Sequence, residues 1–209
     1  MIIKTVDNFL SQEECNEIIS LIEQNNQRSS IAGEEKNTRI ITKSRTSNTS
    51  FLSNKNTIVN AIKQKISKIL NIDTKQIESL QGIKYISGQY FLPHRDGYEG
   101  IRKENLTKES GNRIWSLLIY LNEDYEGGET GFPLLNLDIK PKKGMALMWH
   151  NLRENGDLLD ESLHEGKLVV SGTKYIITTC IREREFTTPS IIGDNVNSNT
   201  EIKYINDDS

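Results

Sequence analysis

Residues 91–98 read FLPHRDGY, and this stretch decides how the rest of the chain is interpreted. Its His94 and Asp96 are two positions apart, so on an extended strand both side chains point to the same side. A third candidate, His164, lies much further along, in SLHEGKLV. Two imidazoles and one carboxylate are the ligand set of a non-heme Fe(II) facial triad, which leaves three coordination positions open. The spacing therefore predicts a metal held between the strands of a barrel.

Each of these residues also has an ordinary structural explanation. Taken alone, His94 could be structural or surface-exposed, Asp96 could be a turn residue before a glycine, and His164 could face solvent at a strand end. The chain has only three histidines, so few other ligand sets exist. The third, His150, is the alternative ligand, but it follows an apolar strand and we expect it to pack instead.

Composition is that of an ordinary, rather polar protein. The 209 residues are 35% hydrophobic and 26% charged, which suits one domain with a real core. No apolar run approaches the length of a membrane span, and the N-terminus becomes polar too soon for a secretory signal, so we expect a cytoplasmic protein. The net charge of −3 gives no general attraction for nucleic acid. Cys15 and Cys180 fit no metal or redox spacing and are expected to be buried, reduced residues.

Helices come first in the expected organisation. Ser11 and Glu14 form a capping box at the start of one helix, and isoleucines at helical spacing predict another over 55–70. Residues 26–50 are polar and predict loops with a short edge strand. From residue 81 the pattern changes to short β runs, expected at 81–87, 90–94, 113–121, 129–132, 145–150, 166–170 and 174–182.

Helices followed by many strands predict helices packed on the outside of a β-sandwich or barrel. We expect one domain over 1–185, in the α+β class. Residues 186–209 are polar and rich in Asn and Asp, and are expected to form a poorly structured tail or an edge extension.

Five segments in one order resemble the catalytic domain of prolyl 4-hydroxylases of the collagen, plant and viral type. These segments are SRTSNTSFL, YISGQYFLPHRD, NRIWSLLIYLNEDYEGGETGFP, KPKKGMALMW and SLHEGKLVVSGTKYIITTCI, and the opening VDNFLSQEEC is also similar. The resemblance covers roughly residues 5–183 and implies a double-stranded β-helix, or jelly roll. It also implies Fe(II), the cosubstrate 2-oxoglutarate, O2 and ascorbate as cofactors. Lysine ten positions after His164 is closer to the collagen type than to the oxygen-sensing hydroxylases, which usually carry arginine there.

The resemblance assigns three residues to 2-oxoglutarate. Lys174 would pair with the far carboxylate, since its apolar neighbours argue against full exposure and an inward charge needs a partner. The Tyr85 hydroxyl would reach the same carboxylate, and Thr130 would add a hydroxyl donor. Each of the three also has a purely structural explanation. Lys174 could extend along a strand to solvent, Tyr85 could be a core residue of the sheet, and the glycines before Thr130 could mark only a turn.

The same resemblance implies that three residues bind the peptide substrate: Arg45, Glu78 and Arg113. Each of them could equally be a surface charge. Two departures put the substrate in doubt. Cys180 stands where the family commonly has a tryptophan, and Phe91 replaces a common tyrosine. The polar segment 97–112 lies where the family has a mobile loop over the substrate, although it could be an ordinary long loop.

The favoured function is Fe(II)- and 2-oxoglutarate-dependent hydroxylation of peptidyl proline at C4, with release of succinate and CO2. The expected partner is a proline-containing peptide or protein, with no nucleic acid and no membrane. Two alternatives stay open. One is a related dioxygenase acting on a small molecule or nucleic acid, and the other is a non-catalytic binding module of the same fold.

Overall fold

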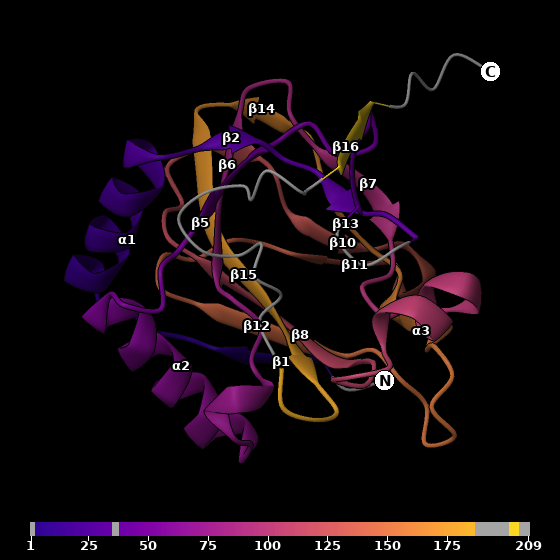
Figure 1. Ribbon diagram of the computed structural model, residues 1–209. Helices are drawn as coiled ribbons and strands as arrows, with labels where there is room; N and C mark the ends of the chain where they lie inside the picture. Colours follow the sequence, from indigo (N-terminus) through magenta and orange to yellow (C-terminus); the bar gives the residue numbers. More distant parts are fainter. Residues whose placement is uncertain (1–2, 35–37, 187–200, 205–209) are drawn as a thin grey trace.

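A seven-stranded sheet forms the centre of the molecule in this computed structural model, which describes residues 3–34, 38–186 and 201–204. Its strands run in the order β1, β12, β8, β15, β6, β5, β2 (Figure 1). Their bounds are Ile3–Val6, Ala146–His150, Arg113–Tyr120, Thr173–Arg182, Gln81–Ile86, Asn48–Phe51 and Gln27–Arg28. All of these pairings are antiparallel.

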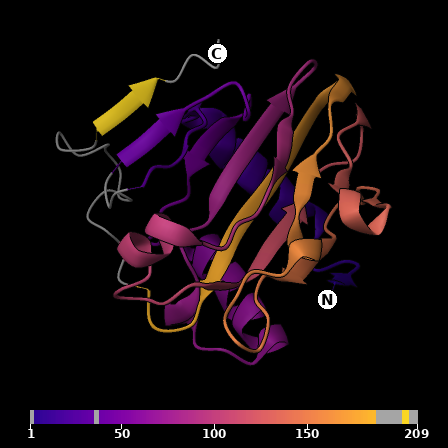
Figure 2. The ribbon, with the colours of Figure 1, turned by 90° about the vertical axis from the view of Figure 1, so that its right-hand side faces the viewer.

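A four-stranded sheet supplies the strands that carry the FLPH segment. It runs β11 (Leu137–Ile139), β10 (Thr130–Phe132), β13 (His164–Gly166) and β7 (Phe91–His94). Two smaller sheets pair β14 (Val169–Ser171) with β9 (Glu126–Gly127), and β3 (Ile31–Ala32), β4 (Thr38–Ile41) and β16 (Glu201–Tyr204) with one another. Figure 2 shows β16, in yellow, lying alongside β4.

Two helices cover one face of the large sheet, on the left in Figure 1. They are α1 (Gln12–Gln24), with the expected capping box at Ser11 and Glu14, and α2 (Thr57–Leu70). A third helix, α3 (Gly100–Leu106), lies on the other side of the molecule, and three single 3-10 turns complete the structure: η1 (Thr74–Gln76), η2 (Pro133–Leu135) and η3 (Asp160–Ser162).

Alternation along the strands divides the core into two layers. On β8, Leu117 and Ile119 pack with the helices, whereas Leu118 and Tyr120 belong to a second cluster with Phe132 and Trp149. Because successive side chains of a strand point to opposite faces, one strand serves both layers. The second layer faces the four-stranded sheet, and it is there that the candidate site lies.

Several expectations need correction. Residues 26–50 hold four short strands, β2 to β5, between loops, where one edge strand was expected. Buried polar side chains, such as Ser29 against Ser47 and Thr49, hide the strand pattern. The expected strand at 166–170 is wrong: β13 and β14 join different sheets on either side of Lys167. The segment 97–112 contains α3 and is not a plain loop. The other expected strands and both helices are confirmed within a few residues.

Candidate functional site

The three predicted metal ligands come together although they lie far apart in the sequence. His94 ends β7, His164 begins β13, and the two are register partners across the four-stranded sheet. Asp96 lies in the turn just after β7. The ligand atoms of the three residues all lie within 4.8 Å of one another, and His94 Nε2 and His164 Nε2 are 3.7 and 3.6 Å from the Asp96 carboxylate oxygens.

Both imidazoles are oriented by backbone carbonyls. His94 Nδ1 is 2.8 Å from the carbonyl oxygen of Leu92, and His164 Nδ1 is 2.9 Å from that of Ser162. A proton on each Nδ1 satisfies those contacts and leaves the Nε2 lone pairs facing Asp96, as metal ligation requires. Phe91 stacks on the His94 ring at 3.6 Å between centroids, which fixes the ring further.

Asp96 is held by a hydrogen-bond chain that the sequence did not reveal. The Ser116 hydroxyl donates to Asp96 Oδ2 at 2.5 Å, and the Asn151 side-chain amide donates to Ser116 Oγ at 2.8 Å. Because Asn151 occupies the serine oxygen as an acceptor, the serine proton points at the carboxylate. Ser116 and Asn151 are both fully buried, so solvent cannot replace either bond.

The environment favours the protonation states that a metal needs. Burial, helped by the nearby His164, lowers the pKa of His94 to about 3, so its ring is neutral at physiological pH. Burial alone would oppose ionisation of Asp96, but the neighbouring His164, His94 and Arg113 and the Ser116 hydrogen bond hold its pKa below the usual value. Neutral imidazoles and an ionised carboxylate are the ligating forms.

Lys174 is the most deeply buried charged side chain among the described residues. It is 1% exposed, its Nζ donates to the Gly128 carbonyl at 2.6 Å, and no described carboxylate forms an ion pair with it. Burial lowers the pKa of Lys174 to about 7. An ammonium in this position lacks a counterion, so the site suits an anion such as a carboxylate.

The other two predicted 2-oxoglutarate residues line the same cavity as Lys174. Tyr85 is its register partner on β6, and the lysine Nζ lies 5.2 Å from the tyrosine ring centre. Thr130 is buried and its hydroxyl is 2.6 Å from that of Tyr120, a residue the sequence analysis did not select. Lys174, Tyr85 and Thr130 all line the same cavity as the His94, Asp96 and His164 cluster.

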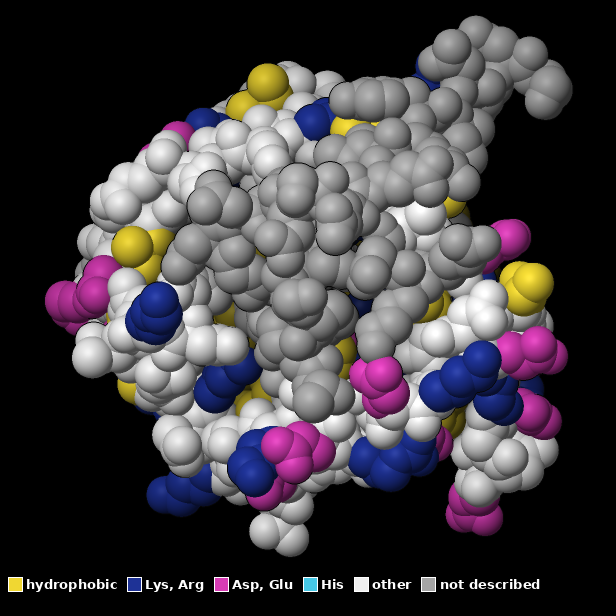
Figure 3. Space-filling view, viewed as in Figure 1, with side chains coloured by type: hydrophobic (Ala, Val, Ile, Leu, Met, Phe, Trp, Pro, Cys, Tyr) yellow, Lys and Arg dark blue, Asp and Glu magenta, His cyan; other side chains and the backbone are white. Residues whose placement is uncertain are grey.

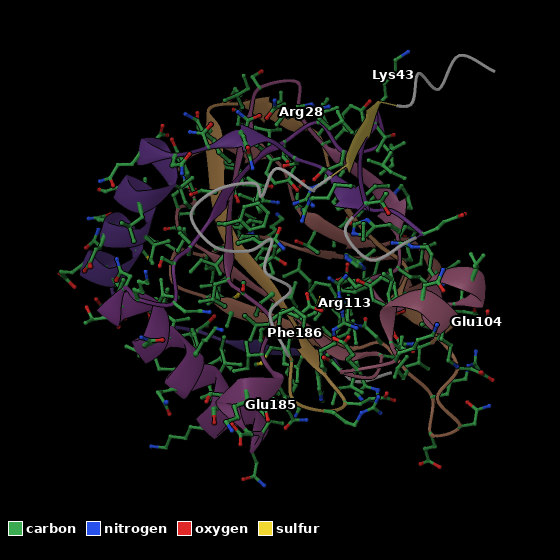
Figure 4. All side chains as sticks on the ribbon, viewed as in Figure 1. Arg28, Lys43, Glu104, Arg113, Glu185 and Phe186 are labelled. Atoms are coloured by element: carbon green, nitrogen blue, oxygen red, sulfur yellow. The ribbon has the colours of Figure 1, made fainter. Side chains whose placement is uncertain are left out.

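Two of the predicted peptide residues bind each other. Arg113 grips Glu78 with two hydrogen bonds of 2.8 Å, and Arg182 Nε lies 2.6 Å from the same carboxylate. Glu78 is therefore an anchor for two arginines and is 6% exposed. Figure 4 shows Arg113 pointing into the interior beside the sheets, and Arg113, Phe186 and Arg45 all line the cavity.

Alternation on β15 could have identified Arg182. Counting by two from Lys174 along this strand reaches Ile176, Thr178, Cys180 and Arg182, and all of them line the cavity. Cys180 is buried and burial raises the pKa of its thiol, so it is an inert wall residue as expected. His150 packs edge-on against Trp115 at 4.9 Å and is not part of the ligand cluster, which confirms its expected packing role.

The cavity has a volume of about 820 Å³. It runs from Lys174, between the two sheets, past the ligand cluster to α3 and the β3–β4 hairpin. Such a cavity can hold a small cosubstrate at its inner end and part of a larger molecule at its mouth.

Comparison with known proteins agrees with this arrangement. Residues 80–182 match the family described as the 2OG-Fe(II) oxygenase superfamily. A prolyl 4-hydroxylase relative from Acanthamoeba polyphaga mimivirus is 32% identical, with 87% of this chain and 74% of that protein covered. Prolyl 4-hydroxylase 5 of Arabidopsis thaliana is 33% identical, with 86% and 67% covered.

A solved structure is similar along almost its whole length. The viral collagen prolyl hydroxylase of Paramecium Bursaria Chlorella virus-1, solved as a complex with 2OG, shares 28% identity at a TM-score of 0.68, with 87% of this chain and 96% of that chain covered. The fold and site thus define a 2OG-Fe(II) oxygenase, an enzyme that uses Fe(II), 2-oxoglutarate and O2. Within that class, the chain belongs to the prolyl 4-hydroxylase family.

Proposed function

We propose that this enzyme hydroxylates peptidyl proline at C4. The observation that carries the proposal is one cavity of about 820 Å³ that contains both the His94, Asp96 and His164 cluster and a buried lysine without a described ion pair. The relatives are named as prolyl 4-hydroxylases, and this supports the choice of proline. Two neutral imidazoles and a carboxylate fit Fe(II).

The chain's own residues would perform binding, orientation and exclusion of water. His94, Asp96 and His164 would hold Fe(II), while Lys174, with Tyr85 and Thr130 beside it, would hold 2-oxoglutarate by its far carboxylate. When bound, the metal and cosubstrate supply the oxidising chemistry with O2. Arg45 and Arg113, the latter fixed by Glu78, would bind peptide carbonyls beside the ligand cluster, where Arg45 lies over the Phe91 ring and Arg113 donates to the Asp96 carbonyl. Ascorbate as an accessory reductant stays a prediction.

The fold of the core and the bounds of the domain are also part of what we propose. We assign a double-stranded β-helix core, which the two facing sheets support, and a catalytic domain over 1–185 with an extension over 186–209. Within that extension the structure describes residue 186 and β16, while the rest lies outside the described residues. No helix in the described ranges is long and apolar enough to cross a membrane, and cytoplasmic location stays a prediction.

A proline-rich peptide library incubated with Fe(II), 2-oxoglutarate and ascorbate tests the activity. Mass spectrometry should find peptides that gain one oxygen on proline with one succinate formed for each. Asp96→Ala is the matched control and should form neither product, because the two imidazoles alone cannot hold the metal facially. If succinate forms without any proline product, and a small molecule or nucleobase is oxidised instead, the prolyl assignment fails.

A further inference from the structure

The lining of the cavity is cationic, unlike the molecule as a whole. Among the described residues that line the cavity, eight are arginine or lysine and four are aspartate or glutamate, although the whole chain carries a net charge of −3. Figure 3 shows both signs interspersed over the described surface of one face. The cationic excess is thus a property of the cavity and not of the protein surface in general.

The proposed cofactors do not neutralise this excess. Fe(II) and Lys174 together would meet the charges of 2-oxoglutarate and Asp96, so the inner end becomes close to neutral. Glu78 is shared between Arg113 and Arg182, so one of those two positive charges stays uncompensated. Arg95 is paired with Asp160 outside this count, whereas Arg39 and Arg102 have no carboxylate ion pair among the described residues.

Two arginines from different elements, Arg39 and Arg102, line the cavity together with the ligand cluster. Arg102 on α3 donates to the carbonyl oxygen of Ala32 at 3.2 Å, and Ala32 on β3 is the register partner of Arg39 on β4. Arg39 lies over the Phe51 ring at 5.1 Å, and its Nε donates to the Ser30 hydroxyl at 2.6 Å. Neither arginine forms an ion pair with a carboxylate among the described residues.

Both groups retain capacity to bind an anion. Arg102 Nε is a buried donor without a hydrogen-bond partner. Burial, and then the neighbouring positive charges of Arg45 and Arg113, lower the pKa of Arg39 to about 10. A negative group beside Arg39 would offset its repulsion from Arg45 and Arg113, and Arg102 would add a second positive charge to the same cavity wall.

We propose that the cavity, through Arg39 and Arg102, selects a peptide with an aspartate or glutamate near the residue to be hydroxylated. This inference rests on the proposed function and narrows its substrate class to acidic proline-containing peptides. A carboxylate suits the planar guanidinium fork, which can bind it with two parallel hydrogen bonds. The β3–β4 hairpin and α3 supply the two arginines to the same cavity as the ligand cluster, so the flank of a bound peptide would contact them.

Matched peptides test the inference. Three peptides would share one proline sequence and differ only at the flanking position, which carries glutamate, glutamine or lysine. The wild-type enzyme should show a kcat/KM at least about tenfold higher for glutamate than for glutamine, equivalent to about 1.4 kcal/mol. Added salt should reduce the preference only weakly, because both arginines are partly buried and ions screen such charges much less than exposed ones.

Substitutions test whether Arg39 and Arg102 cause the preference for the glutamate peptide. Arg39→Gln and Arg102→Gln should each lower the glutamate-to-glutamine ratio towards one, and the double change Arg39→Glu with Arg102→Glu should favour the lysine peptide. Lys142→Gln is the matched control, since Lys142 is exposed, pairs with Asp7 and does not line the cavity, so the ratio should not change. If a variant turns over too slowly, the affinities of the labelled peptide pair for Mn(II)- and 2-oxoglutarate-loaded protein give the same ratio.

A ratio near one in the wild type, or an unchanged ratio in both glutamine variants, would overturn the inference. So would equal competition against the acidic peptide by inorganic phosphate or single-stranded DNA, which would indicate a general anion site. Equal hydroxylation of all three peptides contradicts the acidic preference alone. Absence of any hydroxylated proline contradicts the proposed function itself, so the two failures can be told apart.

Discussion

Among single residues, Ser116 is the one whose role follows most directly from its contacts. It receives a hydrogen bond from Asn151 and passes one to Asp96, so it orients a carboxylate that would bind the metal. Hydrogen bonds to charged groups are worth about 1.5–3 kcal/mol. Ser116→Ala should therefore weaken Mn(II) binding roughly tenfold to a hundredfold, as measured by calorimetric titration.

Ser79→Ala is the matched control for this prediction. Ser79 is equally buried, but its hydroxyl has no hydrogen-bond partner, so metal affinity should stay at the wild-type value. The Mn(II) affinity of Asn151→Ala should lie between those of the two serine variants, because the Ser116 hydroxyl stays but is no longer oriented by the Asn151 amide. A Ser116→Ala protein with wild-type Mn(II) affinity would refute the orienting role.

Lys174 should couple 2-oxoglutarate binding to proton uptake. Its pKa of about 7 in the ligand-free protein leaves it mostly neutral at pH 8, and a bound carboxylate favours the charged form. Calorimetry at pH 8 in buffers of different ionisation enthalpy should show uptake approaching one proton per 2-oxoglutarate. Lys174→Arg, which is charged at any pH, should show almost none. Wild-type binding with no dependence on the buffer would contradict this assignment.

The lowered pKa of Lys174 also determines how the free energy of unfolding changes with pH. The folded-state pKa of Lys174 lies below its unfolded value of 10.5, so between pH 7 and about 10.5 the unfolded chain binds more protons. From this group alone, the free energy of unfolding of the ligand-free protein should rise with pH across that window. Lys174→Met should remove the rise, which urea unfolding at several pH values would measure.

Among the elements, α2 packs its buried isoleucines against one face of the large sheet. Ile62 is fully buried between α2 and the large sheet, whereas Ile69 on the same helix is 41% exposed. Deleting a buried isoleucine to alanine typically costs about 2–5 kcal/mol. Ile62→Ala should lower the free energy of unfolding by that amount in urea titrations. Ile69→Ala is the control and should cost clearly less, and equal losses at both positions would contradict the packing described.

For the whole molecule, the two proposed cofactors should stabilise the fold together. The ligand cluster joins β7 to β13, and Lys174 lies on β15 of the other sheet, so metal and 2-oxoglutarate would link both sheets. A ligand at 100 times its Kd adds about 2.7 kcal/mol. Mn(II) with 2-oxoglutarate should raise Tm by roughly 5–10 °C, more than either ligand alone. His164→Ala should abolish the metal-dependent part, and a similar rise in that variant would contradict the site.

Local signals explain the parts of the fold that the sequence determined. The capping box at Ser11 and the helical spacing of isoleucines over 55–70 depend on neighbours within a few residues, and both helices form as expected. The same holds for the spacing of His94 and Asp96 and for the alternation that begins at Lys174, which brings these side chains to one cavity.

Tertiary pairing decided the rest, because those contacts join residues whose relation is invisible along the chain. The register of β7 with β13 places His164 against His94, and the pairing of β8 with β12 and β15 brings Asn151 to Ser116 and Arg113 towards Arg182. Strands β2 to β5 are short and carry no strong apolar alternation, so the pairing of β2 with β5 and of β3 with β4 is evident only in the tertiary structure. The sequence thus determined which residues could bind metal and cosubstrate, while sheet register decided which side chains orient them and gave the cavity its cationic lining.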